Sequence, residues 1–282
     1  MDSKLCLWSV DKRRCQAVAH HTRSISSVKA GGNDVVYSAS YDGTVAAWAL
    51  GGGERATENA KPCNVFKGHK SPVLELACQG PLVASGGKDG ALLCWDSDSG
   101  SCLMRLRAHD AAVTALMFPS REENVIISGS ADGLIKTWDP RTKALLSSAA
   151  LHKDRASGSG APVAGLAAVG EHLLVSGGAD NAVHVLDRRR AGDPVCSFFS
   201  CRTGVYSVAT APDERCAFVG DGAGMMHCYD VTRGQQCYGL GASEQGAVRC
   251  IVPVHDYSQI VTGGEDGKAL VFSFSAGAPS AR

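Results

Sequence analysis

Short apolar runs, separated by turn-forming residues, follow one another along this chain. In the segment that begins at His109, residues Val113 to Met117 alternate apolar with small or polar side chains, and Val125 to Ile127 form a β-branched run. A third run extends from Leu134 to Trp138, and Ala144 to Ser147 gives a fourth. Each run has the length of a strand and is bounded by Gly, Ser, Asp, Asn or Pro, which predicts four short antiparallel strands. No stretch of the sequence has the period of a long amphipathic helix.

This four-strand unit recurs at an almost constant interval. An aspartate in a tight turn is followed six residues later by an aromatic residue, and successive turn positions lie 40 residues (Asp2 to Asp42) to 48 residues (Asp132 to Asp180) apart. The pairs are Asp2 and Trp8, Asp42 and Trp48, Asp89 and Trp95, Asp132 and Trp138, and Asp266 and Phe272, with Asp180 and Leu186 and Ala223 and Tyr229 as incomplete versions. A fixed period near 40 residues indicates one supersecondary unit repeated along the chain.

Two further positions repeat with the same period. A hydroxyl residue stands four residues before the turn aspartate, as Ser38, Ser85, Ser128, Ser176 and Thr262. A histidine stands four residues before the first apolar run of a unit, as His21, His69 and His109. We interpret His152 as the same histidine, moved back along the chain by the insertion RASGSGA at 155–161.

The segments KGHKSPV…VASGGKDGALLCWD and RAHDAAV…IISGSADGLIKTWD resemble the Gly-His to Trp-Asp pattern of the WD-repeat (WD40) β-propeller family, and the resemblance covers essentially the whole chain. It implies an all-β propeller whose blades are four-stranded antiparallel sheets around a central channel. It also implies that His, Ser or Thr, Asp and Trp form a hydrogen-bonded tetrad within a blade. The complete sets are His21, Ser38, Asp42 and Trp48; His69, Ser85, Asp89 and Trp95; and His109, Ser128, Asp132 and Trp138.

Two units depart from this pattern. The unit that ends at Tyr229 has Cys201, Val219 and Ala223 at the other three positions, so we expect it to rely on apolar packing. The last unit offers Glu244, Thr262, Asp266 and Phe272, which is a partial set. The departures matter because a buried aspartate must be paired, and each orphaned buried partner costs about 1–3 kcal/mol.

The number of blades is left open between two arrangements. Seven outer-strand signatures are visible, but only six follow inner strands. In a closed six-blade ring, Gln16 to His20 would complete the sheet of residues 247–273. In a truncated seven-blade plan, which we favour slightly, six blades are joined by an N-terminal half blade with an exposed sheet edge. We expect one propeller domain over 1–273 and a short flexible tail over 274–282.

Composition restricts the ligand and the compartment. Lys plus Arg and Asp plus Glu are both 28, so the net charge is zero, which argues against nucleic acid as the main ligand. The twelve cysteines contain no Cys-x-x-Cys pair, so we predict no zinc site and interpret them as small buried hydrophobes. With no signal peptide, they indicate a reducing compartment, the cytoplasm or the nucleus. No apolar run reaches the roughly 18 residues of a membrane-spanning helix.

The sequence offers no catalytic set. Histidines, serines and aspartates are present several times over at repeat positions, whereas a catalyst needs one set beside one pocket. His184 and His227 share an offset on outer strands and raise the alternative of a metal site, but no further ligand is evident and satisfied histidines are favoured. We therefore predict no enzyme activity, no cofactor and no metal.

Function in such a fold lies on surfaces, where we consider two sites. The residue before each turn aspartate should point to the top rim, joined by loop residues there, and an aromatic with arginines is typical of binding hot spots. We hypothesise a non-catalytic scaffold or adaptor for several proteins. The residues proposed to bind partners there are Tyr41, Lys88, Arg23, Arg202 and Glu265.

The second site would bind a different partner, the adaptor of a ubiquitin ligase. Trp138, Asp139 and Arg141 resemble the Trp-Asp-x-Arg box of substrate receptors for cullin-type ubiquitin ligases, and a related segment ends at Arg188 and Arg189. These arginines would contact the ligase adaptor from the bottom face. An enzyme, or an RNA-associated propeller, remains the third class.

Overall fold

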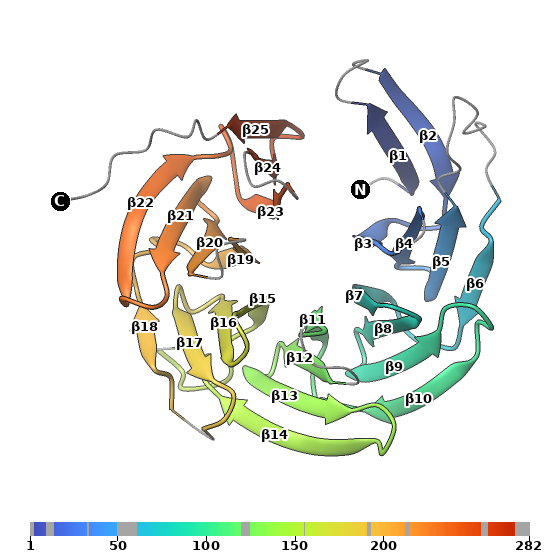
Figure 1. Cartoon of the computed structure of the whole chain (residues 1–282), viewed down its shortest axis with the longest axis horizontal. Coiled ribbons are helices and arrows are strands. Elements are labelled where there is room, and N and C mark those ends of the chain that lie inside the picture. Colours follow the sequence, from blue (N-terminus) through green and yellow to red (C-terminus); the bar gives the residue numbers. More distant parts are fainter. Residues whose placement is uncertain are drawn as a thin grey trace. The chain divides into compact units, whose positions relative to one another are not determined.

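The computed structural model describes residues 3–9, 14–32, 34–49, 61–119, 125–154, 156–190, 193–211, 215–254 and 259–273. All regular structure in these ranges is β-strand (Figure 1). The chain divides into two compact units, residues 1–132 with 136–147, and residues 133–135 with 148–282. Within the described ranges, no helix has the length and apolarity that crossing a bilayer requires. The proposed tail at 274–282 lies outside the described residues.

The first unit contains most of four antiparallel sheets. One is two-stranded, β1 (Lys4–Ser9) with β2 (Arg14–His20), and three are four-stranded. The second sheet contains β3 (Ile25–Ala30), β4 (Val35–Ser40), β5 (Thr44–Ala49) and β6 (Asn64–Lys67). The third contains β7 (Val73–Gln79), β8 (Leu82–Gly87), β9 (Ala91–Asp96) and β10 (Cys102–Arg107). The fourth contains β11 (Val113–Met117), β12 (Ile126–Ser130), β13 (Leu134–Asp139) and β14 (Ala144–Ala150).

The second unit contains the last three sheets. The first has β15 (Val163–Val169), β16 (Leu173–Gly178), β17 (Val183–Asp187) and β18 (Cys196–Phe198). The next has β19 (Val205–Thr210), β20 (Cys216–Asp221), β21 (Met225–Asp230) and β22 (Gln235–Gly241). The last has three described strands, β23 (Val248–Pro253), β24 (Gln259–Gly264) and β25 (Ala269–Ser273). The predicted unit of four short antiparallel strands is thus confirmed.

The closed-ring pairing is wrong. Residues 14–20 pair with Lys4–Ser9, with Lys4 opposite His20, and the two strands form a sheet of their own. They do not extend the sheet of β23, β24 and β25 in the described pairings. The two-stranded sheet corresponds to the expected N-terminal half blade.

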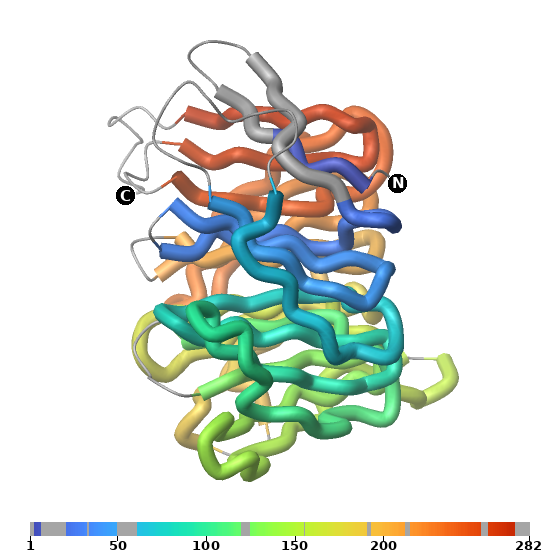
Figure 2. The backbone as a smooth tube through the Cα atoms, turned by 90° about the vertical axis from the view of Figure 1, so that its right-hand side faces the viewer, coloured from blue at the N-terminus to red at the C-terminus, as the bar shows by residue number. Residues whose placement is uncertain are grey.

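Within each unit, neighbouring sheets lie side by side (Figure 2), and buried apolar side chains form clusters between them. Val45 and Phe66 of one sheet form a cluster with Leu76, Leu93 and Trp95 of the next. In the second unit, Val185 and Tyr229 belong to one such cluster. Small and β-branched side chains predominate because two pleated faces must approach closely and interlock.

The first strand of every four-stranded sheet, and of the last sheet, begins with an irregularity that the sequence did not reveal. One residue there lacks a partner in the ladder to the second strand, as in a β-bulge. The residues at this position are Ser26, Leu74, Thr114, Ala164, Tyr206 and Arg249. A bulge turns the extra side chain away from the regular alternation, so these six positions share one orientation in their own sheets.

Candidate functional site

The sheet of β3 to β6 contains a complete hydrogen-bonded tetrad. Nε2 of His21 lies 2.7 Å from Oγ of Ser38, and Nδ1 of His21 lies 3.1 Å from Oδ2 of Asp42. The indole N–H of Trp48 donates to Oγ of Ser38 at 2.8 Å. If Nδ1–H donates to the carboxylate, Nε2 accepts the serine hydroxyl, whose oxygen then accepts from the indole, and every polar atom is satisfied.

The carboxylate of this tetrad is held in its charged form. Burial opposes ionisation, but hydrogen bonds from Thr44 and the neighbouring His21 outweigh it and lower the pKa of Asp42 to about 2. The tetrad therefore fixes the loop before β3 and the turn after β4 to the interior of one sheet.

Two further sheets repeat this arrangement. His109 contacts Ser128 at 2.8 Å and Asp132 at 3.0 Å, and Trp138 donates to Ser128 at 2.9 Å. His152 contacts its serine and aspartate at 2.9 and 2.8 Å, although a buried leucine replaces the tryptophan. His152, which precedes the insertion at 155–161, therefore occupies the same position in its sheet as His21 and His109 do in theirs.

The sheet of β7 to β10 has an incomplete version. Nε2 of His69 lies 2.8 Å from Oγ of Ser85, which also accepts the indole N–H of Trp95. Nδ1 of His69 is buried without a hydrogen-bond partner among the described residues, and Asp89 instead accepts the backbone N–H of Ala91. Burial lowers the pKa of His69 to about 4. A cleft of about 360 Å³ opens beside this histidine.

The sheet of β19 to β22 has a polar network that the sequence did not predict. Oδ2 of the buried Asp221 lies 3.1 Å from Nε2 of His227, whose Nδ1 lies 3.0 Å from the side-chain nitrogen of Gln236. The hydroxyl of Tyr229 contacts Oγ of Ser200 at 2.7 Å. The expected apolar packing is present, since Ala217, Val219 and Tyr229 belong to one buried apolar cluster. The unexpected feature is Asp221, a carboxylate two residues upstream of Ala223 that anchors a different polar network.

The last sheet is held differently again. Thr262 donates to the backbone carbonyl of Ala242 at 3.3 Å. Asp266 accepts the backbone N–H groups of Glu244 and Lys268, whose side chains also form an ion pair. The Thr262 hydrogen bond is buried, whereas the contacts of Asp266, Glu244 and Lys268 are exposed and contribute less than the buried tetrads.

The two histidines considered as metal ligands belong to separate networks. Nδ1 of His184 lies 2.7 Å from Oγ of Ser197, and its ring centroid lies 4.8 Å from that of His152. His184, His152 and Asp180 have ligand atoms within 4.8 Å of one another, but both nitrogens of His152 already contact Ser176 and Asp180. A metal ion here would have to break the hydrogen bonds of His152 with Ser176 and Asp180.

In the six sheets from β3 to β25, the residue before the turn occupies an equivalent place, which we call the turn end. Its backbone N–H donates across the end of the sheet to the loop before the first strand. The donors are Tyr41, Lys88, Ala131, Ala179, Gly222 and Glu265, and the acceptors are Ser24, Pro72, Ala112, Pro162, Gly204 and Ala247. In the first unit, Arg23 and Lys88 are exposed at this end and Tyr41 is half-buried.

In the second unit, the turn end carries a cluster of an aromatic, a cation and an anion. The guanidinium carbon of Arg249 lies 4.5 Å from the ring centroid of Tyr206, and Arg249 also pairs with Glu265. Tyr206 is 41% exposed, and Arg202 is exposed in the preceding loop. We call Tyr206, Arg249 and Glu265 the bulge cluster.

The bulge cluster has a structural cause. Tyr206 and Arg249 occupy the same bulge position in neighbouring sheets, so both side chains leave the regular alternation in the same way. A β-carbon at Gly222 would lie 2.9 Å from the ring of Tyr206, so the glycine leaves room for the ring. Glu265 could be predicted from the sequence, but Tyr206 and Arg249 could not, because a bulge has no signature in residue type.

The arginines of the ligase-receptor hypothesis follow the last residues of β13 and β17, at the strand ends opposite to the turn end. Trp138 is buried, and Oδ1 of Asp139 accepts the backbone N–H of Arg141, whose side chain is 72% exposed. Arg189 donates to both carboxylate oxygens of Asp187, at 3.0 and 2.7 Å. The backbone N–H of Arg188 donates to the carbonyl of residue 172. Each arginine thus pairs with an aspartate of its own turn, at 3.8 Å between Nε of Arg141 and Oδ1 of Asp139, and each side chain stays largely exposed.

Comparisons with known proteins agree on the repeat. A family model described as "WD domain, G-beta repeat" matches residues 60–96 and 100–139. The COMPASS component SWD3 of Saccharomyces cerevisiae is 32% identical over 93 residues, which is 32% of this chain and 30% of the relative. The ribosome biogenesis protein YTM1 of Meyerozyma guilliermondii is 26% identical over 89% of this chain and 62% of the relative. A WDR12 homolog from Chlamydomonas reinhardtii is 32% identical over 57% of this chain and 36% of the relative.

The chain thus spans between about a third and two thirds of the length of these relatives. Solved structures show the same fold at low identity. A chain of the mitotic checkpoint complex superposes with a TM-score of 0.84 at 18% identity, covering 97% of this chain and 82% of that chain. The WD40 β-propeller domain of Doa1 superposes with a TM-score of 0.81 at 19% identity, covering 98% and 88%.

Proposed function

Because this chain belongs to the WD-repeat β-propeller family, we propose that it is a non-catalytic scaffold that binds partner proteins through the turn ends of its sheets. Three relatives are described as a COMPASS component and as ribosome biogenesis proteins. These names support protein interaction in general. They also favour the nucleus or the cytoplasm as the compartment of this chain. The zero net charge supports protein rather than nucleic acid as the main ligand.

The bulge cluster carries this proposal. Tyrosine and arginine are enriched at binding hot spots, because a rigid amphipathic ring and a planar cation contribute large contacts at low entropic cost. Tyr206 is exposed although it is anchored over Gly222, and Arg249 is held against it. The cluster is therefore ordered before a partner arrives, which reduces the entropic cost of binding.

The chemistry of the cluster defines the partner. Glu265 accepts the backbone N–H of Ala247 at 3.0 Å and forms an ion pair with Arg249, whose side chain remains about half exposed. A peptide that places an apolar side chain on Tyr206 and a carboxylate against Arg249 and Arg202 fits this surface. In the first unit, Arg23, Tyr41 and Lys88 offer the same types of side chain, and we propose them as a second contact region.

Affinity purification of the full chain tests this function. We expect the double variant Tyr206→Ala and Arg249→Ala to lose partners that the wild type retains, by about 2 kcal/mol or more in affinity. Arg141→Ala, an exposed arginine at the opposite strand end, is the matched control and should keep those partners. An unchanged set of partners in the double variant, with the thermal melt also unchanged, would refute the placement.

The exposed side chain of Arg141 favours a second candidate function. As a substrate receptor, the chain would present Arg141 and Arg189 to an adaptor of a cullin-type ubiquitin ligase. Copurification of such an adaptor, lost on Arg141→Ala and kept in the Tyr206 and Arg249 variant, would support it. If no adaptor copurifies with the wild type, this candidate is removed.

A further inference from the structure

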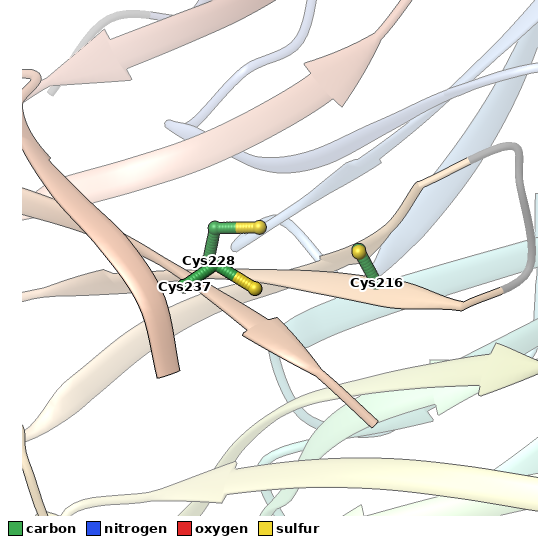
Figure 3. A group of neighbouring side chains, drawn as sticks. All are labelled: Cys216, Cys228 and Cys237. Carbon is green, nitrogen blue, oxygen red and sulfur yellow. The ribbon is translucent and has the colours of Figure 1, made fainter. Parts of the chain in front are cut away.

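Three cysteines from neighbouring strands converge in the sheet of β19 to β22 (Figure 3). They are Cys216 of β20, Cys228 of β21 and Cys237 of β22, and their sulfur atoms all lie within 4.8 Å of one another. Cys228 is buried, Cys216 is half-buried and Cys237 is exposed, so the group opens to solvent on the side of β22. Nothing in the tetrad or in the bulge cluster uses these thiols.

The strand register explains why they meet. Cys216 lies opposite Asp230 and Phe218 lies opposite Cys228, so Cys216 and Cys228 are diagonal neighbours on one face of the sheet. On the other side, Tyr238 pairs with Cys228 and Gln236 pairs with Tyr229. Cys237 is therefore the extra residue of a bulge, which brings its side chain toward Cys228.

We propose that Cys216, Cys228 and Cys237 bind one thiophilic d¹⁰ metal ion, Zn²⁺ or Cu⁺, as three thiolate ligands. Thiolates prefer these ions, and a Zn–S bond of about 2.3 Å sets tetrahedral ligand sulfurs roughly 3.8 Å apart. Small rotations about the Cα–Cβ bonds bring sulfur atoms within 4.8 Å to that separation. Binding releases the three thiol protons to solvent. The solvent-facing side leaves room for a water ligand on Zn²⁺.

The place of the site gives it a structural role. This sheet lacks the His, Ser, Asp and Trp tetrad, and β22 is its edge strand (Figure 1). A metal ion bound to β20, β21 and β22 joins the edge strand to the interior of the sheet. Protein stability then rises with metal occupancy, because the ion binds the folded state and the unfolded chain lacks a preformed site.

The test uses the full chain, purified under reducing conditions and exposed to Zn²⁺ in one arm and Cu⁺ in the other. Native mass spectrometry after dialysis should show one bound ion in at least one arm, and the arm that retains it identifies the ion. Addition of Co²⁺ in place of Zn²⁺ should give the thiolate-to-cobalt charge-transfer absorption. The melting temperature should rise with the bound metal.

The variants separate ligands from packing. Cys237→Ser alters an exposed side chain, so the protein should fold but lose the bound ion and the metal-dependent rise in melting temperature. Cys228→Ser should lose the ion as well. Cys102→Ser, an exposed cysteine on the edge strand β10, is the matched control and should bind metal as the wild type does. Retention of the ion by Cys237→Ser would overturn the assignment.

Two further results would also overturn it. One is the absence of bound Zn²⁺ and Cu⁺ while all three thiols are reduced. The other is a disulfide among the three cysteines in the purified protein, with no metal uptake after reduction. Since the readout is metal content and not partner binding, the outcome is independent of the proposed scaffold function.

Discussion

The sheet of β3 to β6 and the sheet of β19 to β22 hold their strands together with different chemistry. In the first sheet, the carboxylate of Asp42 lies in the turn. Hydrogen bonds connect it through His21 and Ser38 to the buried indole of Trp48. In the second sheet, the carboxylate belongs to Asp221, at the end of the second strand. Hydrogen bonds connect it to His227 on the third strand and, through His227, to Gln236 on the fourth. The requirement for a satisfied buried carboxylate is common to both.

The difference shows what the tetrad does. The His21 network joins the loop before the sheet to its second and third strands. In the other sheet, that loop is held separately by the contact of Ser200 with the Tyr229 hydroxyl, and the Asp221 network joins the outer strands to one another. A repeat can therefore lose its signature residues and keep its form, provided that each buried polar group still has a partner.

The largest expected effect tests whether the Asp221 network is equivalent to a tetrad. Asp221→Ala leaves His227 and the backbone N–H groups of Ala223 and Met225 without their acceptor, which should lower the free energy of unfolding by about 3 kcal/mol. Ser38→Ala in the tetrad should cost about 2–4 kcal/mol, because both His21 and Trp48 lose a partner. Urea titration measures both. A cost below about 1 kcal/mol for Asp221→Ala would contradict the equivalence.

An intermediate effect concerns acid. Burial lowers the pKa of His69 and of His184 to about 4, whereas an unfolded histidine has a pKa of about 6.5. As the pH falls, the unfolded chain binds these protons at a higher pH than the folded chain does. The contribution of the two neutral histidines to the free energy of unfolding is therefore complete above pH 6.5 and is lost between about pH 6.5 and pH 4. The loss should be on the order of 2 kcal/mol per histidine. In melts over this range, His69→Gln should show a shallower pH dependence than the wild type, and an equal slope would contradict it.

A smaller effect concerns the loop contact. Tyr229→Phe removes the hydroxyl that contacts Ser200 and Cys201 but keeps the buried ring, so the free energy of unfolding should fall by about 1 kcal/mol. Thermal melts of Tyr229→Phe and of Ser200→Ala should give similar shifts. If the double variant loses as much free energy of unfolding as the two single variants together, the two side chains do not interact, which would contradict the prediction.

The smallest effect concerns Cys237 in metal-free protein. Its side chain is exposed on an edge strand, so Cys237→Ser should change the free energy of unfolding by less than about 0.5 kcal/mol when chelator is present. A loss of several kcal/mol under these conditions would mean that the thiol packs into the sheet and that the metal is not the source of its contribution.

Much of the fold could be predicted from the sequence, because the repeat records it several times. The sequence predicts a strand over Val113 to Met117, which is β11, and the turn positions recur at the same end of the six sheets from β3 to β25. The histidine at 152 could be placed despite the insertion, because its serine and aspartate partners kept their spacing.

Features that depend on register could not be predicted in this way. A bulge adds a residue without changing residue types, so the exposure of Tyr206 and the position of Arg249 became visible only in the sheets. Asp221 was missed because the repeat pattern places the carboxylate two residues later. The cluster of three cysteines could not be predicted from Cys-x-x-Cys spacing, because strand pairing and not sequence spacing brings them together.

The central claim is that partner proteins bind at the turn ends of the sheets. Hydrogen–deuterium exchange on the full chain, with and without a partner recovered by affinity purification, tests it most directly. We predict that the partner slows exchange at residues 203–208 and 248–250, around Tyr206 and Arg249. Slowed exchange confined to the opposite strand ends, around Arg141 or Arg189, with no change around Tyr206, would contradict the claim.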